Sequence, residues 1–225
     1  MSVTRPTDGE MPSRCRKGGG ATMGSFGPVD RERVLAVRSE LQHPQGSGMD
    51  VRGWQGDITT LDVDAIVNAA NSTLARGGGV CGAIFRAAGL ELDAACDAIG
   101  RCENGDAVAT PGFDLASRWV IHTVGPVWDG GNFGEAEQLA SCYRRVVEVA
   151  GEIGAKTVAI PAISTGIFGF PADQASEIAV RTLLTNGSTG IDEVVLVAFD
   201  EETAVRYERL LERGVEPQCR SVRHE

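Results

Sequence analysis

The sequence predicts an α/β protein, a three-layer α/β/α sandwich with a sheet that is mostly parallel in its centre. Two observations predict this class. Short apolar runs typical of buried strands alternate with amphipathic segments of helical period, and this alternation extends from residue 49 to residue 213. Parallel strands need crossover helices, and those helices cover both faces of the sheet. The chain of 225 residues has the length of one domain with some additional tail.

Six segments have the composition of strands. Their central residues are mostly valine, isoleucine and alanine, as in strands that are buried on both faces. Turn residues, chiefly glycine and aspartate, bound most of them. The predicted strands are 51–58, 64–70, 107–112, 119–125, 157–164 and 193–200.

Four segments predict helices. The first follows three consecutive glycines, and Ala83, Ile84, Ala87 and Ala88 share one of its faces. The third has a proline at its start, where the missing N–H has no cost. The predicted helices are 80–99, 135–153, 171–185 and 201–213.

The two ends of the chain differ from this regular part. Residues 1–48 are rich in glycine, proline, serine and charge, and their one short helix candidate is 28–41. We expect a poorly ordered N-terminal extension there. Residues 49–215 form the predicted domain, and residues 216–225 form a C-terminal tail.

The charge of the chain limits its partners. The net charge is −10, and residues 1–48 carry seven Lys/Arg against five Asp/Glu, so the remainder carries −12. Sequence-independent binding to duplex DNA depends on Lys and Arg that neutralise phosphates, which an acidic domain disfavours. A phosphate site in this chain must therefore use backbone amides and helix ends.

The cysteines and histidines predict no metal site. The chain has three histidines, and its cysteines form no CxxC pair and no spacing typical of zinc ligands. No segment resembles a signal peptide or reaches the roughly 18 apolar residues of a membrane span, so we expect a cytoplasmic protein with reduced thiols and no membrane contact. The six cysteines are Cys15, Cys81, Cys96, Cys102, Cys142 and Cys219.

Three loops follow predicted strands and are candidates for a ligand site. They span 56–59, 71–81 and 164–170. In open α/β sheets, ligands bind outside the carboxyl ends of the strands, where such loops lead into helices.

Two of these loops predict a diphosphate site. The glycines at 77–79 lack Cβ atoms, so their amide groups can approach an anion at the start of the following helix. A flexible surface loop is the alternative. The loop STGIFGF at 164–170 also follows an apolar strand and precedes a helix, and together the two loops could hold one diphosphate from both sides. Neither loop is a Walker A or a Rossmann motif.

Individual residues near these loops have a functional and a structural interpretation. The carboxylate of Asp57 could accept a hydrogen bond from the amino group of adenine, or cap a turn. Phe199 could stack on a base or belong to the core. Of Asn68 and Asn71, one is expected to be a buried structural amide and the other to face the ligand. His122 lies in an apolar strand and is expected to be a hydrogen-bonded core residue.

Several motifs together resemble the macrodomain family, in particular the MacroD-type branch that contains O-acetyl-ADP-ribose deacetylases and mono-ADP-ribosyl hydrolases. The resemblance extends in order from about residue 50 to residue 213. It implies a mixed six-stranded sheet and a surface cleft that binds ADP-ribose, without a metal or another cofactor. The motifs are GDITTLDVDAIVNAANSTLARGGGV, GAIFRAAG, GDAVATPGFDL, WVIHTVGPVW, IPAISTGIFGFP and VVLVAFDEETAVRYERLL.

The resemblance also implies roles for particular residues. Asp57 would bind the adenine amino group with Ile58 beside it, and Phe199 would pack on the base. Asn71 would hydrogen-bond the distal ribose and orient the bond to be cut, with Phe168 against that ribose. The diphosphate would be held by backbone amides of Gly78, Gly79, Val80, Ser164, Thr165, Gly166, Ile167 and Phe168.

The sequence departs from the MacroD pattern at two positions. Cys81 and Phe85 stand where these hydrolases usually have an aspartate and a histidine. Cys81 has three interpretations: an apolar filler in a domain that only binds, a bystander while the phosphate of the substrate activates water, or a thiolate acting as base or nucleophile. We favour the second. The candidate catalytic residues are Asn71 and Cys81.

The predicted function is hydrolysis of ADP-ribosyl linkages. The candidate substrates are mono-ADP-ribose esters of acidic side chains, O-acetyl-ADP-ribose and nucleobase-linked ADP-ribose. The alternative is a non-catalytic module that only binds ADP-ribose. The expected partners are ADP-ribose, or protein or DNA that carries it, and the expected oligomeric state is a monomer.

Overall fold

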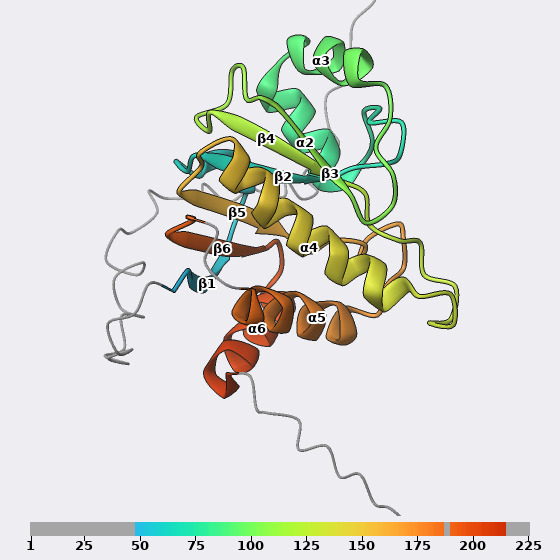
Figure 1. Cartoon of the computed structure of the whole chain (residues 1–225), viewed down its shortest axis with the longest axis vertical. Coiled ribbons are helices and arrows are strands. Elements are labelled where there is room, and N and C mark those ends of the chain that lie inside the picture. The colour runs from blue at the N-terminus through green and yellow to red at the C-terminus, as the bar shows by residue number, and fades with distance from the viewer. Residues whose placement is uncertain (1–47, 187–189, 215–225) are drawn as a thin grey trace, which may run out of the picture. The chain divides into compact units, whose positions relative to one another are not determined.

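The computed structural model describes residues 48–186 and 190–214 (Figure 1). The helix candidate at 28–41 and the predicted tail at 216–225 lie outside the described residues, as does all but the last residue of the predicted extension. Within the described ranges, every helix is too short or too polar to span a bilayer.

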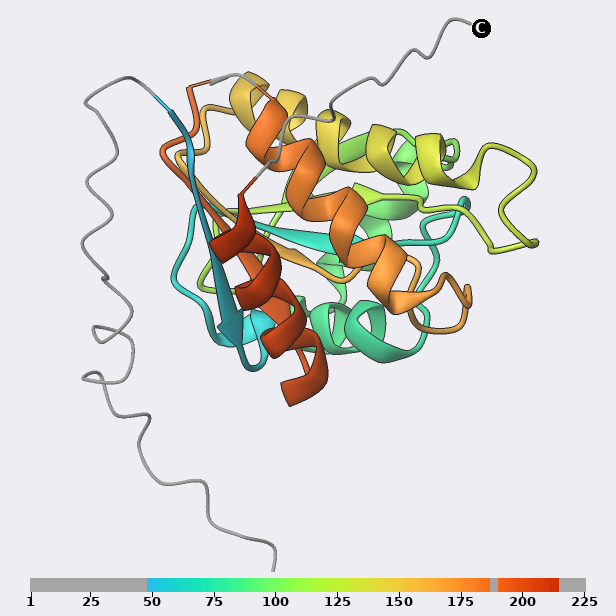
Figure 2. The same ribbon diagram turned by 90° about the horizontal axis from the view of Figure 1, so that it is seen from below.

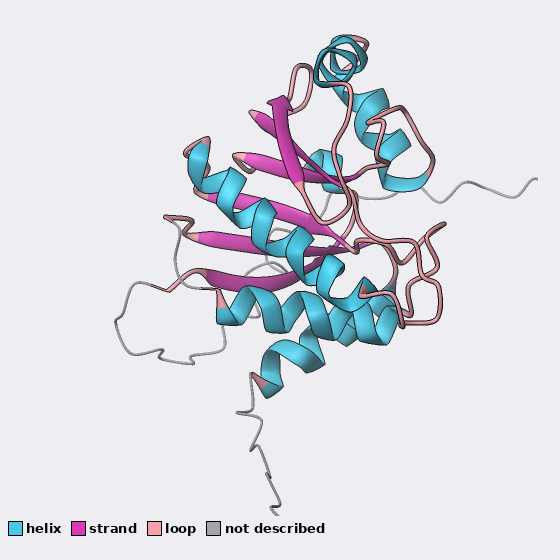
Figure 3. Cartoon of the chain, turned by 45° about the vertical axis from the view of Figure 1, so that its right-hand side comes forward, coloured by secondary structure: helices cyan, strands magenta, loops and turns pink. Residues whose placement is uncertain are grey.

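The strands of the described ranges lie side by side in one mixed six-stranded sheet (Figure 3). Their order is β1-β6-β5-β2-β4-β3. All neighbouring pairs are parallel except β3 and β4, which are antiparallel. The predicted α/β class with a mostly parallel centre is therefore confirmed. The strands are β1 (Asp50–Gln55), β2 (Ala65–Ala69), β3 (Ala107–Pro111), β4 (Trp119–Thr123), β5 (Thr157–Pro161) and β6 (Glu193–Ala198).

Helices cover both faces of this sheet, which gives the three layers (Figures 1 and 2). One face packs against the three C-terminal helices and the other against the two short helices that follow β2. The helices are η1 (Ile58–Thr60), α2 (Gly79–Ala88), α3 (Glu91–Ile99), α4 (Glu135–Glu152), α5 (Ala172–Thr185) and α6 (Glu201–Arg213).

The first three residues of the central strand β2 are apolar because both faces of the strand are covered. Ala65 and Val67 belong to the core beneath α4 and α5, whereas Ile66 belongs to the core beneath α2 and α3. Alternate residues of a strand point to opposite faces, and here both faces are covered. Burying one Val or Ile side chain contributes roughly 1.5–3 kcal/mol, so these residues stabilise both layers.

The prediction of one helix over 80–99 is wrong, because the chain turns between α2 and α3. Gly89 has a φ of +85°, which ends α2. A Cβ at Gly89 would lie 2.7 Å from Asp114 Oδ2, and the Asp114 N–H donates to Ala88 O at 3.3 Å. The β3–β4 connection therefore packs against this turn, and that contact cannot be seen in the local sequence.

The parallel strands β1, β2, β4, β5 and β6 end at the same edge of the sheet. Their following loops begin at residues 56, 70, 124, 162 and 199, respectively. The topology thus brings loops from distant parts of the chain to one place.

Candidate active site

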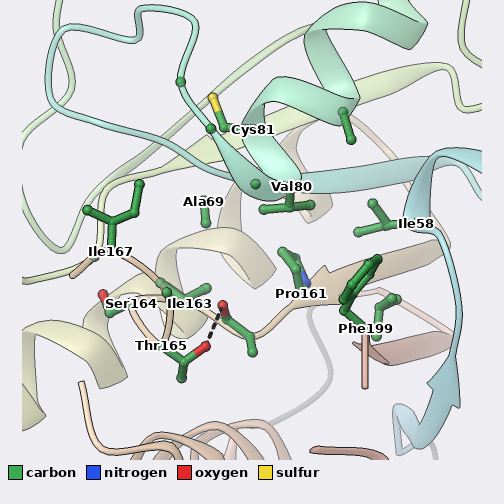
Figure 4. A pocket seen from close by; sticks show the side chains of 18 of the residues that line it. Ile58, Ala69, Val80, Cys81, Pro161, Ile163, Ser164, Thr165, Ile167 and Phe199 are labelled. Carbon is green, nitrogen blue, oxygen red and sulfur yellow. Dashed lines mark hydrogen bonds between the residues drawn. The ribbon is translucent and has the colours of Figure 1, made fainter. Parts of the chain in front are cut away.

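A pocket of about 630 Å³ lies at this edge of the sheet (Figure 4). Loops after all five parallel strands line it. Every residue proposed from the sequence as part of the site lies in its wall: Asp57, Ile58, Asn71, Gly78, Gly79, Val80, Cys81, Ser164, Thr165, Gly166, Ile167, Phe168 and Phe199.

The glycine loop, which contains Gly77, Gly78 and Gly79, lines the pocket at the N-terminus of α2. This helix begins at Gly79 with Gly78 as its N-cap, and it has neither a side-chain cap nor an acidic residue in its first turn. The first N–H groups of a helix have no partner within the helix and carry a partial positive charge. Gly79 has a φ of +56°, and a Cβ there would meet no atom within 4 Å. The helix start is therefore open to an anion.

The loop after β5 forms the opposite side of the pocket. Ser164 has a φ of +65° and accepts the Phe170 N–H at 3.0 Å through its backbone oxygen. Its Oγ is buried and has no hydrogen-bond partner within the described part of the chain. The Ile167 side chain is 90% exposed, and its Cδ1 would lie 3.8 Å from a Cβ at Gly78. The two loops therefore face each other closely, as the sequence predicts.

One end of the pocket is apolar. Ile58 and Phe199 lie there, whereas Cys81 and Ile167 lie at the other end (Figure 4). Phe199 is 88% exposed, so its alternative role in the core is wrong. Asp57 does cap η1, since Oδ1 accepts from the Thr59 N–H at 3.0 Å and from Thr59 Oγ1 at 2.8 Å. Among the described residues no donor reaches Asp57 Oδ2, so the carboxylate keeps an acceptor for a ligand.

The side chain of Asn71 shapes the loop that carries it. Its Oδ1 accepts from the N–H groups of Thr73 and Ala75, both at 3.2 Å, and from Thr73 Oγ1 at 2.8 Å. Its Nδ2 donates to Ala75 O at 2.7 Å. An amide nitrogen carries two hydrogens, so one remains available to a ligand.

Cys81 is buried beside this loop, with 5% of its surface exposed. The Asn68 amide donates to its Sγ at 3.7 Å, and Sγ lies 3.9 Å from Ala75 O, the same carbonyl that Asn71 binds. The thiol therefore lies between the core and the glycine loop.

The predicted core role of His122 is confirmed, and Asn68 is the buried one of the two asparagines. Both are fully buried, and Asn68 Nδ2 lies 3.1 Å from His122 Nδ1. His122 Nε2 lies 2.9 Å from Thr110 Oγ1. Burial lowers the pKa of His122 to about 4. A neutral imidazole that accepts from Asn68 at Nδ1 and donates to Thr110 at Nε2 satisfies these contacts.

Comparisons with known proteins agree with this geometry. The family pattern described as "Macro domain" matches residues 67–179. A Macro domain-containing protein of Mesorhizobium japonicum is 52% identical over 161 residues, which cover 71% of this chain and 92% of that protein. The chain belongs to the Macro domain family.

Further relatives of this macrodomain have more specific names. A protein of Klebsiella pneumoniae named O-acetyl-ADP-ribose deacetylase is 52% identical over 163 residues, covering 69% of this chain and 93% of that protein. The structure of an Oceanobacillus iheyensis macrodomain with ADP matches with a TM-score of 0.70 and 35% identity, covering 75% of this chain and 93% of the other. A Trypanosoma brucei macrodomain in complex with ADP-ribose matches with a TM-score of 0.64 and 35% identity, covering 72% and 68%.

The macrodomain pocket also contains residues that the sequence interpretation missed. Asp200 caps α6 through the Thr203 N–H at 2.8 Å, and this bond lowers the pKa of its carboxyl. Arg86 is the one cationic side chain among the described residues of the wall. It follows Val80 and Ala83 at steps of three along α2, so helical periodicity could have identified it. No cluster of three His, Cys, Asp or Glu within the described ranges could hold a metal ion.

His122 makes the stability of the macrodomain depend on pH. Its pKa is about 4 in the folded chain, against an ordinary value of 6.5, so the unfolded chain binds the proton first as the pH falls. This stabilisation is complete above about pH 6.5 and is lost as the pH falls toward 4. We expect the free energy of unfolding in urea to be about 2 kcal/mol lower at pH 5 than at pH 7.5 through this group. The variant His122→Gln should lose most of this difference, and an unchanged pH dependence would contradict the assignment.

Proposed function

We propose that this macrodomain binds ADP-ribose and hydrolyses ADP-ribosyl linkages. The observation that carries the proposal is the pair of facing loops, one at an uncapped helix N-terminus, beside an apolar end that contains an exposed phenylalanine. Amide groups suit a diphosphate, and the exposed ring suits a base. The names of relatives, O-acetyl-ADP-ribose deacetylase among them, support the same function.

The assignments along the ligand are those that the resemblance to macrodomains implies, and the arrangement of the pocket supports them. Asp57 accepts from the adenine amino group, with Ile58 beside the ring and Phe199 stacked on it. Asn71 binds the distal ribose with its free amide hydrogen, and Phe168 lies against that sugar. Backbone N–H groups hold the diphosphate between the loops, from Gly78, Gly79, Val80, Ser164, Thr165, Gly166, Ile167 and Phe168.

The proposed reaction uses water that is activated by the substrate. The carboxylates among the described wall residues are Asp57 and Asp200, which adjoin Ile58 and Phe199 at the base end. A phosphate oxygen of the substrate is therefore the base that we assign. Water oxygen bonds to the ester carbonyl carbon or to the anomeric carbon, and its proton passes to the phosphate. The bond between that carbon and the ester oxygen then breaks, and the phosphate returns the proton to the departing oxygen, which releases the carboxylic acid and ADP-ribose. Asn71 orients this bond, since positioning alone can contribute several kcal/mol.

Cys81 has a supporting part in this scheme. Its contacts with Asn68 and with Ala75 O suit a hydrogen-bonded side chain that holds the glycine loop, rather than a nucleophile. A thiolate there would also be opposed by the bound diphosphate. We assign Cys81 to the catalytic end of the pocket as a residue that shapes it.

A second candidate is a domain that binds ADP-ribose without cleaving it. The observation that favours it is the lack of a carboxylate beside Asn71 and Cys81 in the described pocket wall. Turnover separates the two functions. The protein is incubated with O-acetyl-ADP-ribose and with aspartyl-, glutamyl-, seryl- and thymidine-linked ADP-ribose, and released ADP-ribose is measured. Release from the esters supports the hydrolase, whereas binding of ADP-ribose without any release supports the reader.

Phe199→Ala tests the base end of the pocket. Base–aromatic stacking contributes about 1–3 kcal/mol, so the Kd for ADP-ribose should rise by roughly 5- to 100-fold. Because Phe199 is 88% exposed, the thermal stability without ligand should not change. Calorimetry and thermal unfolding measure the two effects, and an unchanged Kd would exclude the stacking role.

We further propose a cytoplasmic monomer that acts on ADP-ribosylated protein, or on a single modified nucleobase. The acidic chain, with a net charge of −10, disfavours extended contacts with a duplex but permits contact with one base. Sedimentation of the purified chain at two concentrations tests the monomer, and mass that increases with concentration would contradict it.

A further inference from the structure

The connection between β4 and α4 is organised by one buried carboxylate. Glu135 is the first residue of α4 and is 3% exposed. Its Oε1 accepts from the N–H groups of Asp129 at 3.1 Å and Gly131 at 3.0 Å, and its Oε2 accepts from the Phe133 N–H at 2.7 Å. The connection thus donates three backbone hydrogen bonds to one carboxylate.

These contacts favour the ionised form. The backbone N–H of Glu135 itself, followed by those of Phe133, Gly131 and Asp129, holds the pKa of this carboxyl below its usual value. A carboxylate only accepts hydrogen bonds, and three loop N–H groups donate to this one. An amide at this position would instead place an NH₂ group against an N–H.

The same connection contacts a pocket loop. The backbone N–H of Trp128 donates to Phe168 O at 2.8 Å, and the ring centroids of Trp128 and Phe170 lie 4.6 Å apart. Phe168 lines the pocket, as does Gly125 at the start of the connection. The conformation of residues 125–134 therefore constrains the backbone of the loop after β5 near Phe168.

We propose that Glu135 is a positioning residue for the ADP-ribosyl site, which acts through Trp128 on the backbone of Phe168. The inference rests on the proposed function, because Phe168 is assigned to the distal ribose. Glu135 is not among the residues that line the pocket. Its effect is to hold the backbone of the loop after β5 at the position that the distal ribose and the bond to be cut require.

The test compares Glu135→Gln with Glu137→Gln. Both residues lie in the first turn of α4, and both changes remove one negative charge there. The Glu137 side chain is 77% exposed and pairs with Arg144 on the surface, so its variant controls for charge and for the helix. Circular dichroism first establishes that each variant is folded at the assay temperature.

For Glu135→Gln we expect kcat on an ADP-ribosyl ester to fall by at least about tenfold, within the roughly 100-fold that a 1 Å misplacement can cost. KM should rise by less than the fall in kcat, because the base end is untouched. Hydrogen exchange should be faster at residues 125–134 and also at 164–170. The control should match the wild type in all three measurements.

The outcomes distinguish the inference from the function on which it rests. If wild-type protein releases no ADP-ribose, the proposed function fails, and faster exchange at 164–170 in Glu135→Gln still supports the coupling between the loops. If wild-type protein is active and Glu135→Gln has the same kcat and exchange at 164–170, the inference is wrong. Should Glu135→Gln not fold, Glu135→Asp keeps the charge but shortens the side chain, and wild-type kcat and exchange in that variant would also overturn the inference.

Discussion

Replacing Gly79 with glutamate is expected to weaken ADP-ribose binding by at least about 100-fold, or about 3 kcal/mol. Gly79 is the first residue of α2, and its φ of +56° suits glycine. A side chain there costs about 1–3 kcal/mol in backbone strain, and a carboxylate would repel the diphosphate at the place where the amides should receive it. The affinity is measured by calorimetry with ADP-ribose.

Gly154→Glu is the matched control for this prediction. Gly154 also has a positive φ, of +72°, and also has open space around its Cβ position, but it lies beyond the end of α4 and outside the pocket wall. Both variants should lose similar stability, whereas only Gly79→Glu should lose affinity. Equal affinities in the two variants would remove the glycine loop from the binding site.

Replacing Asn71 with alanine is expected to lower kcat on an ADP-ribosyl ester by roughly 100- to 1,000-fold, the range seen when one hydrogen-bond donor to a reacting group is removed. The Kd for ADP-ribose should rise by less than about tenfold, since the diphosphate amides and Phe199 remain. The variant also loses the bonds from Asn71 to Thr73 and Ala75, which accounts for the modest loss of affinity. Steady-state kinetics and calorimetry measure the two effects.

Thr73→Ala separates loop damage from the catalytic role of Asn71. It removes the 2.8 Å bond from Thr73 Oγ1 to Asn71 Oδ1 but leaves the amide of Asn71 in place. We expect its kcat to stay within about tenfold of the wild type. If Thr73→Ala and Asn71→Ala were equally impaired, the effect would come from the loop alone.

The residues that line the pocket could be predicted from the sequence because their signals are local. The glycines at 77–79, the loop at 164–170 and Phe199 each follow a strand that its apolar residues identify. Parallel pairing then brings the strand ends together without any further information. This is why every proposed site residue lies in one pocket wall.

The features that the sequence did not reveal depend on tertiary contacts. Asp114 packs beside the turn at Gly89, and Glu135 accepts from three N–H groups that only the folded loop presents. The bonds that Asn71 makes within its own loop were likewise not predicted, because they require the turn through Ala75 to be formed. The pattern of residue types along the sequence does not indicate such tertiary contacts.

We propose that the facing loops after β2 and β5 hold a diphosphate with their backbone amides. Calorimetric titration of the wild-type chain with ADP-ribose, and with adenosine as the ligand that lacks phosphates, measures this contribution. We expect saturable heat with a micromolar Kd for ADP-ribose and binding at least about 100-fold weaker for adenosine, a difference of about 3 kcal/mol. No heat with ADP-ribose, or equal affinity for the two ligands, would contradict it.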